Sequence, residues 1–264
     1  MTLEEAINLA NSGDLDAVIA LADYYADENK DIKEAIKWYE KGAIQGNIRC
    51  MYMTALYLVL WTGVKRIAVG YTCAPSLIED LNKALYWYDK ANKCDVSSTN
   101  MENLSDRLYA ELGSTYYYYT IYWLDKESYD NKGKLKSNAK NALDKSIQYF
   151  DNVNNLCEIT AEHEYIYASA ISLLDFGTYD CTDEQRIIKF NLLVDLFENR
   201  FNDLSQPGEV TYKLGECYTL GLGCNKDYDK AVILFNKAQS LGYDCDDYLP
   251  KFRKKLFGGW IYKE

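Results

Sequence analysis

A sequence pattern that recurs along the chain constrains its fold more than any other feature. The most complete copy runs from Leu214 to Ala238 and joins Leu-Gly-x-x-Tyr, Gly-x-Gly and Lys-Ala-x-x-Leu-Phe-x-Lys-Ala. Its second half returns, with substitutions, at 34–42, 83–91 and 145–153. Such repetition indicates an array in which each unit buries its apolar face against the next unit. We therefore predict a single repeat domain over residues 1–264, with no internal boundary.

Within each copy, the spacing of small and aromatic residues predicts helices. Ala35, Trp38, Tyr39 and Gly42 fall at i, i+3, i+4 and i+7, which is one stripe of a helix. The first helices are expected at about 3–10, 15–26 and 32–45. The pattern predicts an all-α fold of about five antiparallel helix pairs between two cap helices. The approximate units are 14–47, 48–94, 100–157, 160–204 and 207–244, followed by a C-terminal cap helix over 248–264.

Two local signals refine this outline. Residues 67–79 are extra relative to the most complete copy and contain Pro75. An insertion in a repeat array maps to a loop on one face, often a binding face, although a loop without function is an equally weighted alternative. Thr182 followed by Gln185 predicts a capping box at the start of a helix.

The net charge of −11 is unevenly distributed. Residues 251–264 carry a net charge of +4, which leaves about −15 on residues 1–250. An acidic body repels phosphate groups, which argues against nucleic acid and anionic membranes as main partners. A basic protein or peptide has the positive charge that an acidic surface attracts. Greater solubility is an equally weighted explanation of the acidity.

The sequence predicts a soluble cytoplasmic protein, with a monomer favoured. The N-terminus lacks the basic region and long apolar run of a signal peptide. The longest apolar stretch, 51–64, is too short to span a bilayer. The eight cysteines form no C-x-x-C pair, so we expect reduced thiols and no metal site. Cys217 and Cys224 are the one pair considered for a disulfide.

No catalytic or cofactor site is predicted. A Ser/His/Asp or Cys/His arrangement would have to use His163, the single histidine, which we expect to be exposed near a helix start. Gly221-Leu222-Gly223 lacks the Gly-Lys-Ser/Thr ending of a phosphate-binding loop and follows a helix instead of a strand. These glycines are expected to form a turn between helices.

The motifs quoted above resemble the Sel-one-like repeat family, a branch of the tetratricopeptide-like α/α solenoids. The resemblance is specific over 211–242, good over 17–47, fair over 81–91 and 109–153, and weak over 161–201. It implies stacked antiparallel helix pairs that wind into a right-handed superhelix. It also implies a non-enzymatic role in holding or recognising other proteins. The fourth unit departs from the family pattern because it lacks the Gly-x-Gly turn.

Tyrosine is unusually abundant, with 25 residues and four in succession at 116–119. Successive helical residues rotate by about 100°, so these four side chains cannot share one buried stripe. Tyr116 occupies the core position of the motif. In the related solenoids the first helix of each pair lines a concave groove. The resemblance offers candidate partner-binding residues in that groove or, for Tyr212, one turn before it: Asp23, Asp27, Ser114, Tyr117, Tyr118, Tyr212 and Glu216.

Tyrosine combined with carboxylates makes an amphipathic surface that suits a peptide carrying Lys or Arg. The alternative is that tyrosine merely fills space between repeats. The leading hypothesis is a non-enzymatic adaptor or scaffold that binds a protein or peptide. A second hypothesis is a dedicated inhibitor or immunity-type protein that neutralises one basic enzyme or toxin. An enzyme, or a regulatory subunit of one, is the alternative from a different class.

Overall fold

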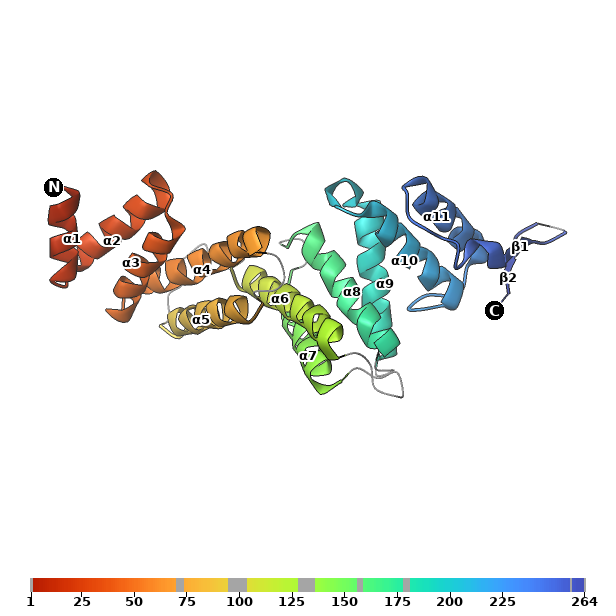
Figure 1. Cartoon of the computed structure of the whole chain (residues 1–264), viewed down its shortest axis with the longest axis horizontal. Coiled ribbons are helices and arrows are strands. Elements are labelled where there is room, and N and C mark those ends of the chain that lie inside the picture. Colours follow the sequence, from red (N-terminus) through yellow and green to blue (C-terminus); the bar gives the residue numbers. More distant parts are fainter. Residues whose placement is uncertain are drawn as a thin grey trace. The chain divides into compact units, whose positions relative to one another are not determined.

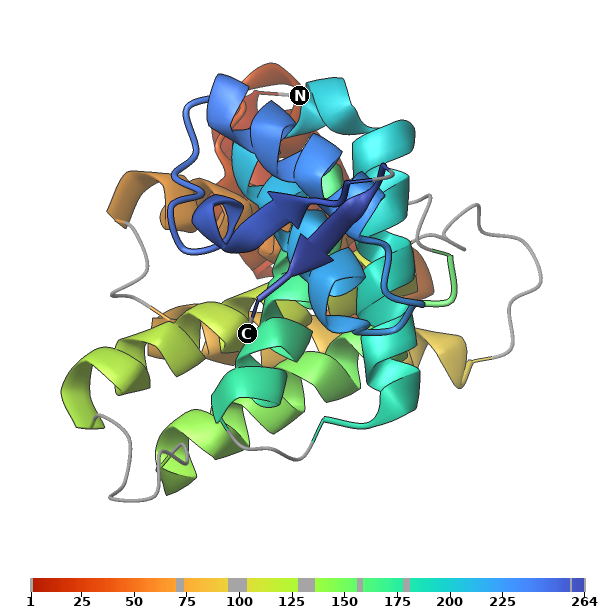
Figure 2. The same cartoon turned by 90° about the vertical axis from the view of Figure 1, so that its right-hand side faces the viewer.

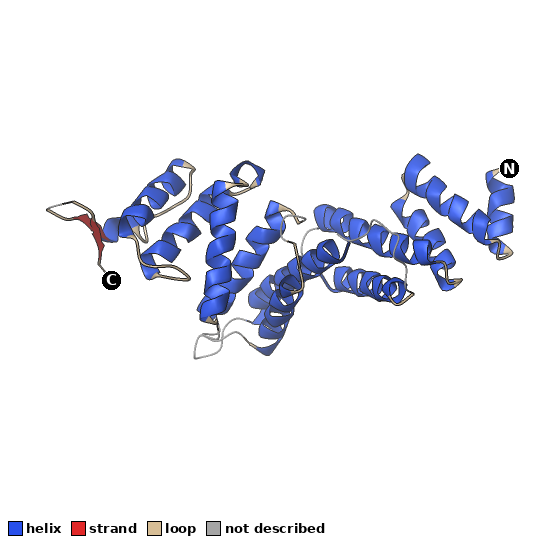
Figure 3. Cartoon of the chain, turned by 180° about the vertical axis from the view of Figure 1, so that it is seen from behind, coloured by secondary structure: helices blue, strands red, loops and turns tan. Residues whose placement is uncertain are grey.

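A computed structural model describes residues 2–69, 74–94, 104–127, 136–155, 159–177, 181–256 and 258–263. Within these ranges the chain is helical except for turns and one short hairpin (Figure 3). The chain divides into two compact units. Unit 1 comprises Met1–Tyr122 and Asp151–Asn154, and unit 2 comprises Trp123–Phe150 and Asn155–Glu264. A single array running through both units stays a prediction.

The helices of unit 1 follow the predicted pairing, and neighbours in sequence pack against each other from α1 to α5 (Figure 1). The cap helix at the N-terminus is confirmed as α1. The second predicted helix differs in its last turn, which is π-helical. In chain order the elements are α1 (Leu3–Asn11), α2 (Leu15–Asp23), the π-helical turn Tyr24–Glu28, α3 (Ile32–Ile44), α4 (Ile48–Val69), α5 (Ala74–Asn92) and α6 (Leu104–Glu127).

Side chains at the helix starts explain where several helices of unit 1 begin. The Asp14 carboxylate accepts a hydrogen bond from the backbone N–H of Ala17 at 2.9 Å. The Asp31 carboxylate accepts bonds from the N–H groups of Lys33 and Glu34. These acceptors satisfy N–H groups that have no partner inside the helix, and so they favour helix initiation at these points.

The small residues of the repeat allow close helix packing, as predicted. A Cβ atom added to Gly42 of α3 would lie 2.5 Å from the Sγ atom of Cys50 on α4. A larger residue would therefore force the two helices apart. Ala35, Trp38 and Tyr39, on the same stripe of α3, are buried.

The prediction that residues 67–79 form an inserted loop is wrong for most of the segment. Helix α4 continues past Gly63 to Val69, and α5 begins at Ala74. Pro75 lies in the first turn of α5, where its missing N–H costs no helical hydrogen bond. The extra residues lengthen two helices, and only residues 70–73 lie outside the described part of the chain.

Unit 2 contains the remaining helices, and α8 packs on α9, α9 on α10, and α10 on α11. The capping box is confirmed, because Gln185 N–H donates to the Thr182 hydroxyl and Thr182 N–H donates to the Gln185 side chain. The helices and turns are α7 (Ser137–Asp151), α8 (Ala161–Gly177), α9 (Asp183–Glu198), a 3₁₀ turn (Phe201–Asp203), α10 (Pro207–Leu220), α11 (Tyr228–Ser240) and a 3₁₀ turn (Leu249–Lys251).

The glycines between α10 and α11 form a turn, as predicted. Gly221 and Gly223 both have a φ of +75°, a conformation that side chains with a Cβ atom rarely adopt. A Cβ atom at Gly223 would lie 2.2 Å from the carbonyl oxygen of Arg186 on α9. Cys217 and Cys224, on either side of this turn, are free thiols.

The predicted C-terminal cap helix over 248–264 is wrong. Two antiparallel strands, β1 (Phe252–Lys254) and β2 (Trp260–Tyr262), pair there with Phe252 opposite Tyr262. Gly258 and Gly259 both have positive φ and turn the chain between the strands. The aromatic rings of Phe252 and Tyr262 lie 5.0 Å apart and pack with buried residues of α11. Strand β2 lies against α11 (Figure 2).

In β2 the half-buried Trp260 and Tyr262 alternate with the exposed Ile261, which suits a strand with one covered face, and this alternation prevails over helical periodicity. None of the described helices combines the length and apolarity needed to cross a membrane.

Candidate functional site

Asp23 lies at the centre of a hydrogen-bond network that joins three helices of unit 1. The Tyr39 hydroxyl on α3 donates to the Asp23 carboxylate at 2.6 Å. Arg49 on α4 donates to both carboxylate oxygens from two guanidinium nitrogens, at 3.0–3.2 Å. Burial and the bond to Asp23 raise the pKa of Tyr39 far above its usual range. Asp23 therefore connects α2, α3 and α4.

Asp27 is exposed on the π-helical turn beyond Asp23, and within the described residues no ion pair to it is formed. The half-buried ring of Tyr57 on α4 stacks on Tyr39, with ring centroids 5.4 Å apart. Burial raises the pKa of Tyr57, and the negative charges of Asp27 and Asp23 raise it further. The surroundings of the Tyr57 ring are consequently electronegative.

Tyr57 belongs to a stripe of side chains at four-residue spacing on α4, which we call the α4 stripe: Arg49, Met53, Tyr57, Trp61 and Lys65. The ammonium group of Lys33 on α3 lies 4.9 Å from the centre of the Trp61 ring. From the sequence, this segment was considered as an apolar stretch too short to span a bilayer, and the stripe was therefore missed. The i, i+4 spacing of polar-tipped residues in an otherwise apolar run is the signal that would have found it.

The three predicted groove residues of α6 differ in their exposure. Ser114 is completely buried, so the prediction that it faces the groove is wrong. Tyr117 and Tyr118 are half-buried, and their rings contact each other edge to face with centroids 5.4 Å apart. Tyr116 is buried, as the motif predicts.

Tyr212 and Glu216 of α10 contact their own unit. The half-buried Tyr212 ring lies 4.8 Å from the Tyr243 ring and 5.4 Å from the Phe235 ring. Glu216 accepts a hydrogen bond from the Tyr248 hydroxyl, and burial raises the pKa of Glu216 despite that bond. Both side chains therefore help to hold the C-terminal segment on α10 and α11.

Asp23 and Glu216 occupy the same place in their repeats, two residues beyond the motif leucine. Each carboxylate accepts a hydrogen bond from a tyrosine of a later element, Tyr39 for Asp23 and Tyr248 for Glu216. This carboxylate–tyrosine pairing is a structural device that the sequence pattern alone did not reveal.

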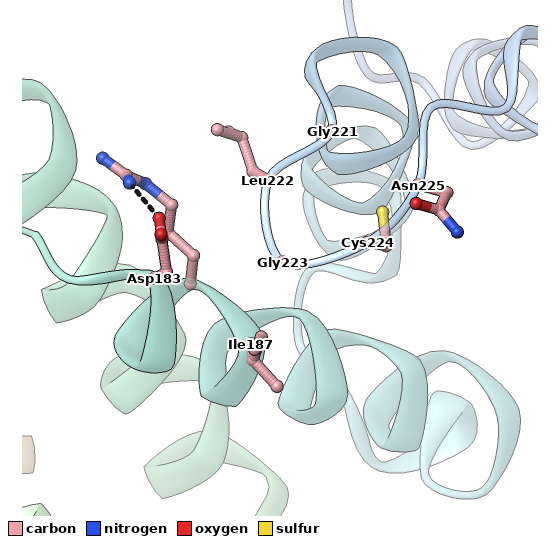
Figure 4. Close-up of a pocket in the computed structure, with 8 residues that line it drawn as sticks. Asp183, Ile187, Gly221, Leu222, Gly223, Cys224 and Asn225 are labelled. Atoms are coloured by element: carbon pink, nitrogen blue, oxygen red, sulfur yellow. Dashed lines mark hydrogen bonds and ion pairs between the residues drawn. The ribbon is translucent and has the colours of Figure 1, made fainter.

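A pocket of about 540 Å³ opens where the start of α9 meets the Gly221–Gly223 turn (Figure 4). Arg186 on its wall donates to Asp183 at 2.9 Å and also to Asp175 of α8. The cation in the pocket is therefore already neutralised by carboxylates of the same unit. The remaining wall is formed by Ile187, Leu222, Cys224 and Asn225.

His163 was expected to be exposed, but it is buried at the start of α8, with its Nδ1 atom 2.7 Å from the Thr160 hydroxyl. Glu164 beside it is also buried and forms an ion pair with Arg200. Burial raises the pKa of Glu164 to about 7, although the Arg200 charge acts in the opposite direction. Arg200 also donates to the carbonyl of Ile159 at 2.8 Å.

Comparison with known proteins identifies the repeats. The family model of the Sel1 repeat matches residues 16–47, 69–96 and 209–243. No curated protein matches the chain. Among solved structures, the chain is similar at 16% identity to c5321 of Escherichia coli, described as a protective antigen of uropathogenic strains with an SLR fold. That match has a TM-score of 0.29 and covers 92% of this chain and 49% of c5321. The chain thus spans about half the length of c5321.

The first and last matched segments coincide with the predicted units 14–47 and 207–244, while the middle one covers the second half of the unit 48–94. Sel1 repeats are in general protein-interaction modules. Three segments of the chain, on a fold of paired helices, are therefore identified as Sel1 repeats.

Proposed function

We propose that the protein is a non-enzymatic binding module that recognises a basic segment of another protein through Asp27, Tyr57 and the neighbouring part of the α4 stripe. The observation that carries this proposal is the half-buried ring of Tyr57, stacked on Tyr39, together with the exposed carboxylate of Asp27. Asp27 forms no ion pair among the described residues, and beyond the effect of burial its negative charge raises the pKa of Tyr57. A lysine or arginine of a partner would face the Tyr57 ring and the carboxylate together.

Asp23 contributes indirectly to this site. Its charge is balanced by Arg49, and its carboxylate is occupied by Arg49 and Tyr39. We infer that Asp23 keeps Tyr39 in place, and that Tyr39 in turn supports the stacked ring of Tyr57. The exposed side chain of Arg49 places one positive charge at the edge of the site, which favours a partner segment with an acidic residue next to its basic one.

The site can be tested by selecting peptides from a random library displayed on phage, with the purified chain immobilised. Enrichment of Lys- or Arg-containing peptides is expected. Asp27→Asn should weaken binding of a selected peptide about five-fold, the effect of losing about 1 kcal/mol from a partly exposed ion pair. Tyr57→Leu, which keeps an apolar side chain but removes the aromatic face, should weaken it by a similar factor.

The matched control is Asp16→Asn, which changes the charge by the same amount at an exposed position in the first turn of α2. Its binding should equal that of the wild type. Selection of acidic or uncharged peptides, or an equal effect of Asp16→Asn and Asp27→Asn, would contradict the proposed site. Thermal unfolding of each variant separates loss of binding from loss of fold.

Tyr117 and Tyr118 are proposed as a second contact region on α6. Both rings are half-buried, so a partner could cover them without a change of fold. The double variant Tyr117→Ala with Tyr118→Ala should bind the selected peptide more weakly than the wild type if the peptide extends to α6. Unchanged affinity with unchanged helicity would limit the site to the α4 stripe.

A further inference from the structure

The C-terminal hairpin carries a charge opposite to that of the rest of the chain. Residues 251–264 have a net charge of +4, from Lys251, Arg253, Lys254, Lys255, Lys263 and Glu264. Arg253, Lys254 and Lys255 are exposed, and Leu256 at the turn is 92% exposed. The turn therefore combines one exposed apolar side chain with three cations, a chemistry that suits an acidic surface with an apolar side chain of its own.

The base of the hairpin is firmly attached to unit 2. Phe252 is buried against α11, and its ring lies 5.9 Å from the Phe235 ring. The backbone N–H of Trp260 donates to the Asp229 carboxylate on α11 at 2.9 Å. The turn projects away from α11 (Figure 1), so Leu256 and the adjacent lysines are held outward by an anchored base.

The same sequence contains a surface of complementary chemistry. Residues 1–29 hold seven acidic residues and no Lys, Arg or His. Glu4 and Glu5 lie in the first turn of α1, and Leu3 and Leu9 on the same helix are each 44% exposed. Glu5 and Leu9, four residues apart, lie on the same face of α1, so that face presents an apolar side chain beside a carboxylate. The hairpin presents an apolar side chain beside ammonium and guanidinium groups.

We propose that the hairpin of one copy of the protein docks on α1 of a second copy. Leu256 would contact Leu9, while Lys254 and Lys255 would face Glu5 and its neighbour Glu4. The two surfaces are different, so the contact is heterologous and leaves a free α1 and a free hairpin at the ends of each dimer. Assembly is then open-ended and extends with concentration unless a ring closes.

The contact should be weak and salt-sensitive. One hairpin turn on a nine-residue helix buries much less than the roughly 1,200 Å² of a stable interface. Its ion pairs are solvent-exposed, and their attraction falls once the Debye length shortens to a few ångströms at high ionic strength. Self-association is therefore expected only at high protein concentration and low salt.

Sedimentation velocity of the full chain tests this proposal. From about 10 to about 500 µM protein at low salt, the weight-average sedimentation coefficient should rise with concentration, and about 0.5 M NaCl should abolish the rise. Lys254→Glu with Lys255→Glu, and separately Glu4→Lys with Glu5→Lys, should each weaken association at least about ten-fold. Leu256→Ser should weaken it without any change of charge.

Charge reversal on both sides gives the decisive measurement. The two double variants repel themselves, but an equimolar mixture pairs opposite charges at every contact and should regain the wild-type association. Lys93→Glu with Lys140→Glu is the matched control, because it makes the same charge change away from the hairpin and should leave association intact.

A wild-type chain that stays monomeric throughout, or a mixture that does not reassociate, overturns the proposal. So does sedimentation with phosphatidylserine vesicles in the absence of self-association, which would assign the hairpin to anionic lipid. These outcomes leave the peptide-binding experiment on Asp27 and Tyr57 unaffected, so the two proposals fail separately.

Discussion

Replacing Glu164 with glutamine should remove a pH dependence that the wild-type fold carries. Glu164 is buried at 2% exposure, and burial raises its pKa from an ordinary 4.5 to about 7 in the folded state. The folded state therefore holds a proton that the unfolded state releases between these two values. The resulting stabilisation is complete below about pH 4.5 and is lost progressively as the pH rises to about 7.

The size of the effect follows from the difference in pKa. At about 1.4 kcal/mol per pKa unit, the stabilisation lost between pH 4.5 and pH 8 is about 3 kcal/mol. Glutamine keeps the shape of the protonated acid and cannot ionise. The free energy of unfolding of Glu164→Gln, measured relative to wild type, should therefore increase by about 3 kcal/mol across this range.

Urea unfolding followed by circular dichroism at several pH values between 4.5 and 8 measures this difference. Glu162→Gln, an exposed position two residues away, is the control, and its difference from wild type should stay constant with pH. A difference that is flat for Glu164→Gln, or that falls with rising pH, would show that the Arg200 charge prevails over burial. The reasoning from desolvation would then be refuted.

Two further predictions concern the turn after α10 and the thiols. Gly223→Ala should destabilise the fold by more than about 1 kcal/mol, because the φ of Gly223 is +75° and the added Cβ would meet the Arg186 carbonyl. Gly63→Ala, in open space within α4, should be neutral or stabilising. Thermal unfolding of both variants measures these two effects. Cys217 is buried, and burial raises its pKa to about 12. Brief iodoacetamide treatment should therefore label the exposed Cys94 and spare Cys217, as detected by mass spectrometry. Equal labelling of the two cysteines would contradict this prediction.

The sequence predicted those features of the fold that depend on local patterns. The capping box at Thr182 and Gln185 follows from three-residue spacing, and the turn at Gly221 and Gly223 follows from residues that tolerate positive φ. The C-terminal hairpin was missed because a short aromatic segment fits both periodicities, and packing on α11 decides between them.

The site residues were predicted less well, because burial of a side chain depends on which helices pack around it. Ser114 and Asp23 occupy equivalent places in their repeats, yet Ser114 is fully buried whereas the Asp23 side chain is 35% exposed. His163 is buried because Thr160 supplies a hydrogen-bond partner close by. Tyr57 was not identified as a site residue because its acidic neighbours come from the π-helical turn beyond α2.

The carboxylate–tyrosine pairing at Asp23 and Glu216 bears on how binding specificity can change in such a protein. A substitution at either carboxylate would leave a tyrosine hydroxyl without its acceptor and loosen the contact between successive elements. New specificities are therefore easier to reach through exposed positions such as Asp27. A combinatorial library for re-engineering this protein should hold Asp23 and Glu216 constant and randomise Asp27, Met53 and Trp61.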